Sequence, residues 1–221
     1  MKDQNKSEIK KLLKAYKECE RVISMYDLDI SYEVVNLAGI DEVGRGPLAG
    51  PIVAAAVILP IYNKKYIMGL NDSKKLSFKR REELSLIIKA TAMSFKIEEI
   101  DNISIDTKGL TYANQQVFKN SCDNLDIVPD LVLTDGYPIK NFHILNKYLI
   151  KGDEKSASIA AASIIAKDYR DKLMKKWSLI YPEYGFDHNA GYGTKEHIIA
   201  LLKYGPSPIH RTSFIKGIMG Q

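Results

Sequence analysis

Residues 37–59 read LAGIDEVGRGPLAGPIVAAAVIL, and this stretch decides the fold. A first apolar run ends on the adjacent acids Asp41 and Glu42, a loop rich in glycine and proline follows, and a second apolar run completes the stretch. Short apolar runs bounded by turn residues are typical of strands that are covered on both faces. Because the connection is short, we expect strands at 37–43 and 51–59 to form an antiparallel hairpin.

Outward from this hairpin, helical and strand patterns alternate. In residues 7–26 the apolar positions recur at three and four, which predicts an amphipathic helix. We expect this helix to pack on the main domain, with partner binding as the alternative, and residues 28–36 to form a connector. The remaining expected elements are helices at 84–92, 112–124, 156–178 and 196–204, and strands at Phe95 to Ile97, 131–134 and 148–150. This order predicts an α/β protein with a mixed five-stranded sheet flanked by helices.

The composition sets bounds on the class of protein. The chain has 221 residues, of which 45% are hydrophobic and 27% charged, enough for one α/β core with a small appendage. The net charge of +5 favours a polyanionic partner. Two cysteines without CxxC spacing argue against a disulfide framework or a structural zinc site. No apolar run is long enough for a membrane span or a signal peptide, so we expect a cytoplasmic protein.

Acidic residues stand at the ends of three expected strands. Asp41 and Glu42 end the first, Asp135 ends the fourth, and Asp153 follows the fifth. Ligands of open α/β sheets gather where strand ends meet, and two adjacent acids at the end of a buried run repel each other unless a cation compensates. These acids therefore predict a metal site, although Asp153 could equally cap the helix that follows it.

The ligand chemistry favours magnesium. Mg²⁺ prefers oxygen donors and keeps waters that can become nucleophiles, whereas zinc would require His or Cys. Four acids could hold two ions about 3.5–4 Å apart, which supports in-line phosphoryl displacement. Adjacent residues of a regular strand point to opposite faces, however. Either the strand breaks up at Glu42, or its long side chain reaches round, or its backbone carbonyl is the ligand.

The loop Gly44-Arg45-Gly46 follows the acid pair directly. Its glycines expose backbone amides and allow close approach of a ligand, and its guanidinium suits a phosphate or a sugar. A metal site beside such a loop indicates phosphodiester chemistry.

Five motifs in series resemble the ribonuclease HII family. They span residues 39–197 in the family's order, and they read IDEVGRGPLAGPIVAAAVIL, LNDSKKLS, LTDGYPI, KGDEKSASIAAASIIAKDYRD and HNAGYGTKEH. The first motif is highly specific, and the others gain their weight from occurring together. The Gly-Arg-Gly triplet resembles the HII type and differs from the triplet of the HIII type.

The resemblance implies an RNase H-like fold and a monomeric endoribonuclease that needs two Mg²⁺ or Mn²⁺ ions when substrate is bound. Its substrates would be the RNA strand of RNA–DNA hybrids and duplex DNA with embedded ribonucleotides, cut to leave 5′-phosphate and 3′-hydroxyl ends. The implied regions are an N-terminal helical extension (1–36), a catalytic domain (37–180) and a C-terminal helical region that completes the substrate site (181–221).

The resemblance also implies roles for individual residues. Asp41, Glu42, Asp135 and Asp153 match the metal-binding, catalytic acids. Gly44, Arg45 and Gly46 match the loop that contacts the ribose 2′-hydroxyl, the one group that distinguishes RNA from DNA at a single position. Tyr192 matches the tyrosine that stacks on the sugar next to the scissile junction. Contacts with the nucleic-acid backbone are implied for Ser73, Lys74, Lys155 and Ser156, where a turn or a helix start is an equal alternative.

Other functions remain as alternatives. A metal-dependent exonuclease of the wider RNase H-like group would often carry Asp-x-Glu, whereas here the two acids have no spacer. A non-catalytic module that binds hybrids would not place four acids against a polyanion. A kinase or GTPase would need a GxxxxGK[ST] loop, which this sequence lacks.

Overall fold

The computed structural model describes residues 2–220, with side-chain surroundings for residues 7–220. Its centre is a mixed sheet in the order β3-β2-β1-β4-β5. β1 is antiparallel to β2 and parallel to β4. The strands are β1 (Leu37–Val43), β2 (Ile52–Ile58), β3 (Ser94–Ile100), β4 (Leu131–Asp135) and β5 (Asn146–Leu149). The predicted hairpin and five-stranded α/β fold are therefore confirmed.

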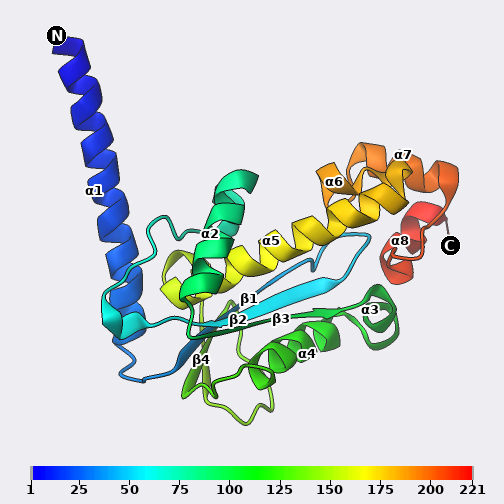
Figure 1. Cartoon of the computed structure of the whole chain (residues 1–221). Coiled ribbons are helices and arrows are strands. Elements are labelled where there is room, and N and C mark those ends of the chain that lie inside the picture. The colour runs from blue at the N-terminus through cyan, green and yellow to red at the C-terminus, as the bar shows by residue number, and fades with distance from the viewer. Residues whose placement is uncertain (1, 221) are drawn as a thin grey trace.

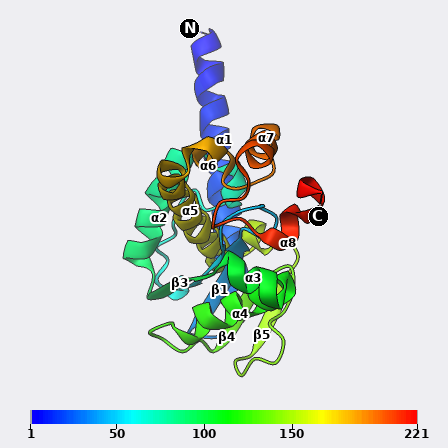
Figure 2. The same ribbon diagram turned by 90° about the vertical axis from the view of Figure 1, so that its right-hand side faces the viewer.

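Helices cover both faces of the sheet. α5 lies along one face with α2 beside it, and α3 and α4 lie on the other (Figures 1 and 2). The α-helices are α1 (Lys2–Ile30), α2 (Phe78–Thr91), α3 (Asn102–Lys108), α4 (Leu110–Asp123), α5 (Ala157–Ile180), α6 (Phe186–Asn189), α7 (Lys195–Tyr204) and α8 (Thr212–Met219). Short 3₁₀ helices are η1 (Ile61–Asn63), η2 (Ser73–Lys75), η3 (Gly152–Glu154) and η4 (Pro182–Tyr184).

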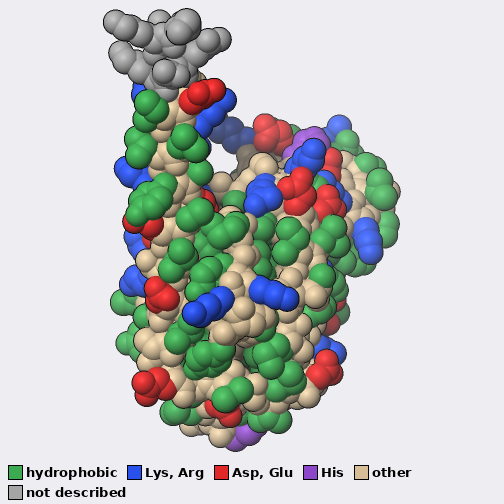
Figure 3. Space-filling view, turned by 60° about the vertical axis from the view of Figure 1, so that its left-hand side comes forward, with side chains coloured by type: hydrophobic (Ala, Val, Ile, Leu, Met, Phe, Trp, Pro, Cys, Tyr) green, Lys and Arg blue, Asp and Glu red, His purple; other side chains and the backbone are tan. Residues whose placement is uncertain are grey.

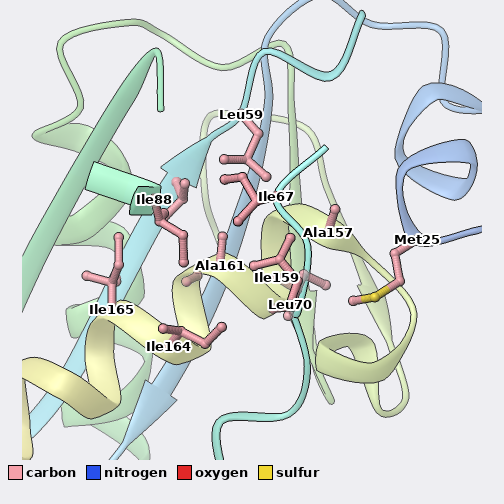
Figure 4. Packing of buried hydrophobic residues seen from close by; sticks show 14 of the residues in the cluster. Met25, Leu59, Ile67, Leu70, Ile88, Ala157, Ile159, Ala161, Ile164 and Ile165 are labelled. Atoms are coloured by element: carbon pink, nitrogen blue, oxygen red, sulfur yellow. The ribbon is translucent and has the colours of Figure 1, made fainter. Parts of the chain in front are cut away.

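The apolar run of β2 shows why both faces must be covered. Every residue of this strand is buried. Alternate side chains enter two separate cores, because successive residues of a strand point to opposite faces. Val53 and Val57 pack in the core under α5, and Ile52 and Ile58 pack in the core over α4. Figure 4 shows the first core, where Ile159, Ala161 and Ile165 of α5 lie among residues from α2 and the segment after β2.

Gly39 allows α5 to lie directly on β1. A Cβ atom at this position would come within 2.1 Å of the Ser158 carbonyl carbon and 2.3 Å of the Ile159 nitrogen. Both are backbone atoms of the helix, so no side-chain rotation could relieve the contact. The glycine therefore sets the distance between the strand that carries Asp41 and Glu42 and the long helix that supports it.

The N-terminal helix is longer and less packed than the sequence predicts. It continues to Ile30, because Asp29 is buried and accepts a hydrogen bond from the Ser158 amide at the start of α5. Met25 reaches toward the start of α5 near Ala157 (Figure 4). The first half of the helix projects from the body (Figures 1 and 3), and its apolar side chains Ile9, Leu12, Leu13 and Tyr16 are exposed. Only the last turns of the helix pack on the main domain. The expectation that the whole apolar face of residues 7–26 would pack there is therefore wrong.

The C-terminal elements gather at the end of α5 that lies away from α1 (Figure 1). They form a third apolar cluster in which Tyr184, Phe186 and Ile209 pack with Ala49 and with Met174 of α5. The C-terminal region thus shares its core with the loop that follows β1. Among the helices of the described part of the chain, none is long and apolar enough to span a membrane.

Candidate functional site

Three carboxylates from separate elements meet at one edge of the sheet. Asp41 lies in β1, Asp135 ends β4 and Asp153 lies in η3, and one oxygen from each lies within 4.8 Å of the others. The parallel pairing of Ile40 with Thr134 brings the next residues, Asp41 and Asp135, side by side. The amide of Gly152 donates to Asp135 Oδ1 at 2.7 Å and so holds η3 against β4. The structure thus brings together three of the four predicted acids, as expected from their positions at strand ends.

Glu42 takes the opposite face of β1. Its carboxylate lies 3.6 Å from the Arg45 guanidinium. The Tyr137 hydroxyl, which accepts a hydrogen bond from Asn114 of α4, lies near enough to lower the pKa of Glu42. Asp41 instead faces α5, where the Ser163 hydroxyl lies near enough to lower the pKa of this carboxylate. The strand therefore stays regular at the acid pair, and the two side chains flank Asp135, whose charge acts on both.

The electrostatics fit a cation. Burial, reinforced by the charges of Glu42 and Asp135, raises the pKa of Asp41 well above its ordinary value. Burial raises the pKa of Glu42 to about 7, against the opposing effect of Arg45. Burial and the charge of Asp135 raise the pKa of Asp153 to about 6. Within residues 7–220, Arg45 is the only basic side chain that forms an ion pair with any of the four acids. Oxygen donors with uncompensated negative charge are what a divalent ion requires.

Two buried arginines hold the connection between β1 and β2, which contains the Gly44-Arg45-Gly46 loop. Arg211 donates to the carbonyls of Gly44, Arg45 and Gly50, and Arg170 of α5 donates to those of Ala49, Pro51 and Ala190. Both side chains are fully buried. Backbone carbonyls take the place of a carboxylate partner here, and these charge-assisted hydrogen bonds therefore fix the geometry of the loop.

Gly44 cannot be replaced in this arrangement. Its φ is +98°, and a Cβ there would lie 2.5 Å from Arg170 Nε and 2.7 Å from the Pro51 carbonyl oxygen. Arg45 and Gly46 are exposed. The loop thus presents its outer backbone to a ligand while its inner carbonyls are occupied.

Tyr192 lies beside this loop. Its ring is 43% exposed, and its Cε1 atom is 3.8 Å from the position that a Cβ on Gly46 would take. The Leu48 amide donates to the Gly191 carbonyl at 2.8 Å, which ties the tyrosine's segment to the loop. The structure therefore brings together the two elements that the sequence places almost 150 residues apart.

The four residues expected near the nucleic-acid backbone divide into two kinds. Lys74 and Lys155 are exposed, and the positive charge of Lys74 acts on Asp153. The serines are buried and have partners within the protein. Ser156 caps α5 by accepting from the Ile159 amide, and the Ser73 and Ser163 hydroxyls are hydrogen-bonded at 2.9 Å. Contact with phosphate stays a prediction for all four residues. The lysines are exposed, whereas the serine hydroxyls already have partners within the protein.

Several supporting residues were missed at the sequence level. Tyr137 and Ser163 lie beside the acids and lower the pKa values of Glu42 and Asp41, and Arg211 holds the loop. Arg170 is buried and donates to carbonyls of the connection between β1 and β2. Tyr137 directly follows Asp135-Gly136 in a quoted motif, which is a signal that could have found it. No spacing marks Arg211.

Comparisons with known proteins identify the family of the chain. The family model described as Ribonuclease HII matches residues 38–217. A protein named Ribonuclease HII from Clostridium acetobutylicum is 52% identical over 217 residues, covering 95% of this chain and 85% of the relative. Among solved structures, the ribonuclease H2 from Pyrococcus horikoshii OT3 superposes with a TM-score of 0.71 at 24% identity, covering 84% of this chain and 97% of that one.

A second solved structure, Bst-RNase HIII in complex with Mn²⁺, has a TM-score of 0.57 at 20% identity and covers 76% of this chain and 61% of that one. At these identities the two structures establish a shared fold. The family match and the high identity to the clostridial relative establish more. The chain belongs to the ribonuclease HII family and is a ribonuclease H hydrolase.

Proposed function

We propose that this protein hydrolyses the RNA strand of RNA–DNA hybrids and incises duplex DNA on the 5′ side of an embedded ribonucleotide, leaving 3′-hydroxyl and 5′-phosphate ends. One observation carries the proposal. The cluster of Asp41, Asp135 and Asp153 is built on the same strand end as the Gly44-Arg45-Gly46 loop, with Tyr192 against that loop. Acids for phosphodiester hydrolysis and groups suited to reading one sugar thus share one rim of the molecule.

We infer that two divalent ions, Mg²⁺ or Mn²⁺, occupy the acidic cluster when substrate is bound. Such ions supply a water of lowered pKa and neutralise the charge that develops on the leaving oxygen. Asp41, Asp135 and Asp153 would hold one site, and Glu42, on the other side of Asp135, would contribute to a second. The Mn²⁺ complex of the HIII neighbour supports including manganese among the metals tested.

The residues of the chain have separate tasks in this proposal. Arg211 presets the loop and Arg170 fixes the segment that follows it, so the backbone of Gly44, Arg45 and Gly46 can face a 2′-hydroxyl without rearranging. The exposed ring of Tyr192 provides a flat surface for the neighbouring sugar. The exposed side chains of Lys74 and Lys155 would contact phosphates, which would position the duplex without reading its sequence. All these residues come from one chain, which supports activity as a monomer.

A covalently closed DNA duplex with a single ribonucleotide tests the reaction type. We expect the wild-type protein with Mg²⁺ to nick this circle once, and end mapping to place the cut 5′ of the ribonucleotide. An exonuclease would leave the circle intact, and a hybrid-binding module would bind without cutting. Full cleavage in excess chelator would contradict the metal requirement.

Asp41→Asn tests the acidic cluster in the same assay. The amide keeps the shape of the side chain but removes one negative charge from the site, so we expect cleavage to fall by at least about a thousandfold, while affinity for the hybrid is unchanged or improved. Asp123→Asn, an exposed carboxylate at the end of α4, is the matched control and should cut normally. Wild-type turnover by Asp41→Asn would refute the assignment.

A further inference from the structure

Two histidines of the C-terminal region are buried, and the proposed reaction does not use them. His197, in the first turn of α7, is 0% exposed, and His210, directly before Arg211, is 1% exposed. Their Nε2 atoms lie 3.0 Å apart. His197 Nδ1 is 2.9 Å from the carbonyl oxygen of Tyr192, and His210 Nδ1 is 2.9 Å from the amide nitrogen of Ser207.

These neighbours fix every proton of the pair. The carbonyl of Tyr192 can only accept, so His197 must carry its proton on Nδ1. The amide of Ser207 can only donate, so Nδ1 of His210 must be bare. The Ser207 hydroxyl lies 2.8 Å from the same nitrogen and therefore also donates to it. One proton then remains for the contact between the two Nε2 atoms, and it belongs to His210, which donates to His197. Each ring is neutral, and each has a defined tautomer.

The surroundings keep the pair dry. The rings of Tyr184 and Phe186 lie against both imidazoles, with Tyr184 4.9 Å from His210 and Phe186 5.4 Å from His197 between ring centroids. Burial lowers the pKa of His197, and it lowers the pKa of His210 to about 4 with a further contribution from His197. The Tyr184 hydroxyl donates to the Gly205 carbonyl, which fixes the Tyr184 ring beside the two histidines. Neutral rings fit an apolar enclosure, where an unpaired charge would be costly.

The pair joins the two elements that face the substrate. His210 reaches the Tyr192 carbonyl through His197, and its neighbour Arg211 reaches the carbonyls of Gly44 and Arg45. The Arg211 amide also donates to the Leu48 carbonyl, and Ala49 pairs with His210 in an isolated β-bridge. One dipeptide, His210-Arg211, therefore supports the tyrosine on one side and the Gly-Arg-Gly loop on the other.

We propose that His197 and His210 are positioning residues for Tyr192, acting as a directional relay in which His210 imposes the Nδ1–H tautomer on His197 and His197 thereby holds the Tyr192 carbonyl. This rests on the proposed function of Tyr192 at the ribose junction. Without the donor from His210, His197 is free to take the opposite tautomer, which would place a bare nitrogen against the carbonyl oxygen. The Tyr192 segment would then lose its anchor while the acidic cluster stays intact.

The relay can be tested first in the wild-type protein, without any substitution. Long-range ¹H–¹⁵N correlation spectra of the imidazoles distinguish the two neutral tautomers and the cation. Between pH 6 and pH 8 we expect His197 protonated on Nδ1 only and His210 on Nε2 only. An Nε2–H tautomer for His197, or a cationic ring for either residue at pH 7, would overturn the relay.

A matched pair of substitutions at His210 tests the effect of the relay on cleavage. In His210→Gln the side-chain amide nitrogen lies near the position of Nε2 and can still donate to His197, whereas His210→Leu fills similar volume without a donor. We expect His210→Leu to lower kcat/KM at a single embedded ribonucleotide by about tenfold, the size of one lost hydrogen bond. Cleavage of a long hybrid should fall much less, and His210→Gln should restore the ratio of the two activities. Equal ratios in both variants, normal or impaired, would overturn the proposal.

A double substitution separates failure of the relay from failure of the proposed function. If the relay acts through Tyr192, His210→Leu should have no further effect on the ratio in the Tyr192→Ala background, because the two changes remove the same contribution. Additive losses would overturn the relay. If Tyr192→Ala alone leaves the ratio unchanged, the junction role of Tyr192 fails.

Amide hydrogen exchange at Leu48, which donates to the Gly191 carbonyl, then decides whether the histidine pair anchors the Tyr192 segment. Faster exchange in His210→Leu but not in His210→Gln supports it, and equal exchange refutes it.

Discussion

Arg211 shows how one side chain can set the geometry of a loop that it does not belong to. Its guanidinium is buried without a carboxylate, and its donors all point at carbonyls of residues 44–50. Burial, reinforced by the charge of the nearby Arg170, lowers its pKa to about 9. A planar group with five fixed donors suits this role, because it can satisfy several carbonyls at once.

Replacing Arg211 by lysine should therefore not be conservative. An ammonium group is a compact donor and cannot reach the carbonyls of Gly44, Arg45 and Gly50 together, so at least one would be left buried and unpaired. We expect Arg211→Lys to lower the free energy of unfolding by about 3 kcal/mol in urea titrations. Arg80→Lys, at an exposed arginine of α2, should change it by less than about 0.5 kcal/mol. Equal effects would contradict the argument from geometry.

At the residue scale, the sequence predicts functional residues that are neighbours in one motif and misses those that only the fold brings together. Asp41, Glu42 and the glycine loop are neighbours in one motif, so their chemistry can be inferred from the order of the residues alone. Arg211 reaches the same loop from 160 residues away, and no local pattern distinguishes it from a surface arginine. The separation of Glu42 from the three aspartates could not be inferred either, because strand alternation left three solutions open.

At the scale of elements, the distance between β1 and α5 depends on Gly39. Any side chain at this position would overlap the backbone of α5. We expect Gly39→Ala to destabilise the protein by about 3 kcal/mol or more, and to reduce cleavage because Asp41 is carried by the displaced strand. Gly217→Ala in α8 is the matched control. Open space surrounds Gly217, and alanine favours helix, so this change should be neutral or stabilising in thermal unfolding. A stable Gly39→Ala variant would show that α5 can shift without cost.

The junction between α1 and α5 should respond to pH. Asp29 is buried at the start of α5, and burial raises its pKa from an ordinary value of 3.8 to about 6, against the effect of hydrogen bonds from Ser156 and Ser158. The Asp29 carboxyl group thus binds its proton more tightly in the folded protein than in the unfolded chain. Its contribution to stability is fully present below about pH 3.8 and is lost as the pH rises through about 6.

Asp29→Asn keeps the acceptor for the Ser158 amide and removes this titration. Relative to wild type, the variant should gain about 2.4 kcal/mol in free energy of unfolding between pH 4 and pH 8. Denaturant titrations at intervals across this range measure the difference directly. A difference that stays constant with pH would mean that Asp29 titrates normally in the folded protein.

Elements with strong periodicity were predictable, and short ones with a single anchor were not. β1 and β2 follow from apolar runs that are buried on both faces, and α5 follows from its alanine-rich face against the sheet. By contrast, α3 buries only Ile105 and α8 only Ile215, so neither leaves an apolar stripe in the sequence. The end of α1 was misplaced for a similar reason, since its last turn is held by a carboxylate, Asp29, that periodicity treats as solvent-facing.

At the scale of the whole molecule, the candidate site is a junction between two parts of the chain. The sheet supplies the acids, and the C-terminal region supplies Tyr192, His210 and Arg211, which hold or face the loop between β1 and β2. The shared apolar cluster of Ala49, Met174 and Phe186 makes this junction part of the core. Loss of the C-terminal region would therefore be expected to disorder the loop as well as remove the tyrosine.

The N-terminal helix differs from the C-terminal region, because only its last turns pack on the rest of the described chain. Residues 8–17 are exposed throughout, whereas Val22, Met25 and Tyr26 are buried, and the Tyr26 hydroxyl accepts from the Ile67 amide at 3.1 Å. Removing residues 2–17 takes away, among the residues with described side chains, only exposed ones. It should therefore change the free energy of unfolding by less than about 1 kcal/mol and leave nicking of the closed circle intact.

Met25→Ala should cost about 2–4 kcal/mol, because it opens a cavity between α1 and the start of α5. Urea titrations and the nicking assay on the truncated chain, the Met25→Ala chain and the full chain compare the two halves of the helix directly. If truncation destabilises the protein as much as Met25→Ala, the projecting turns stabilise the fold through the packed ones. If it abolishes nicking while stability is kept, those turns contact the substrate.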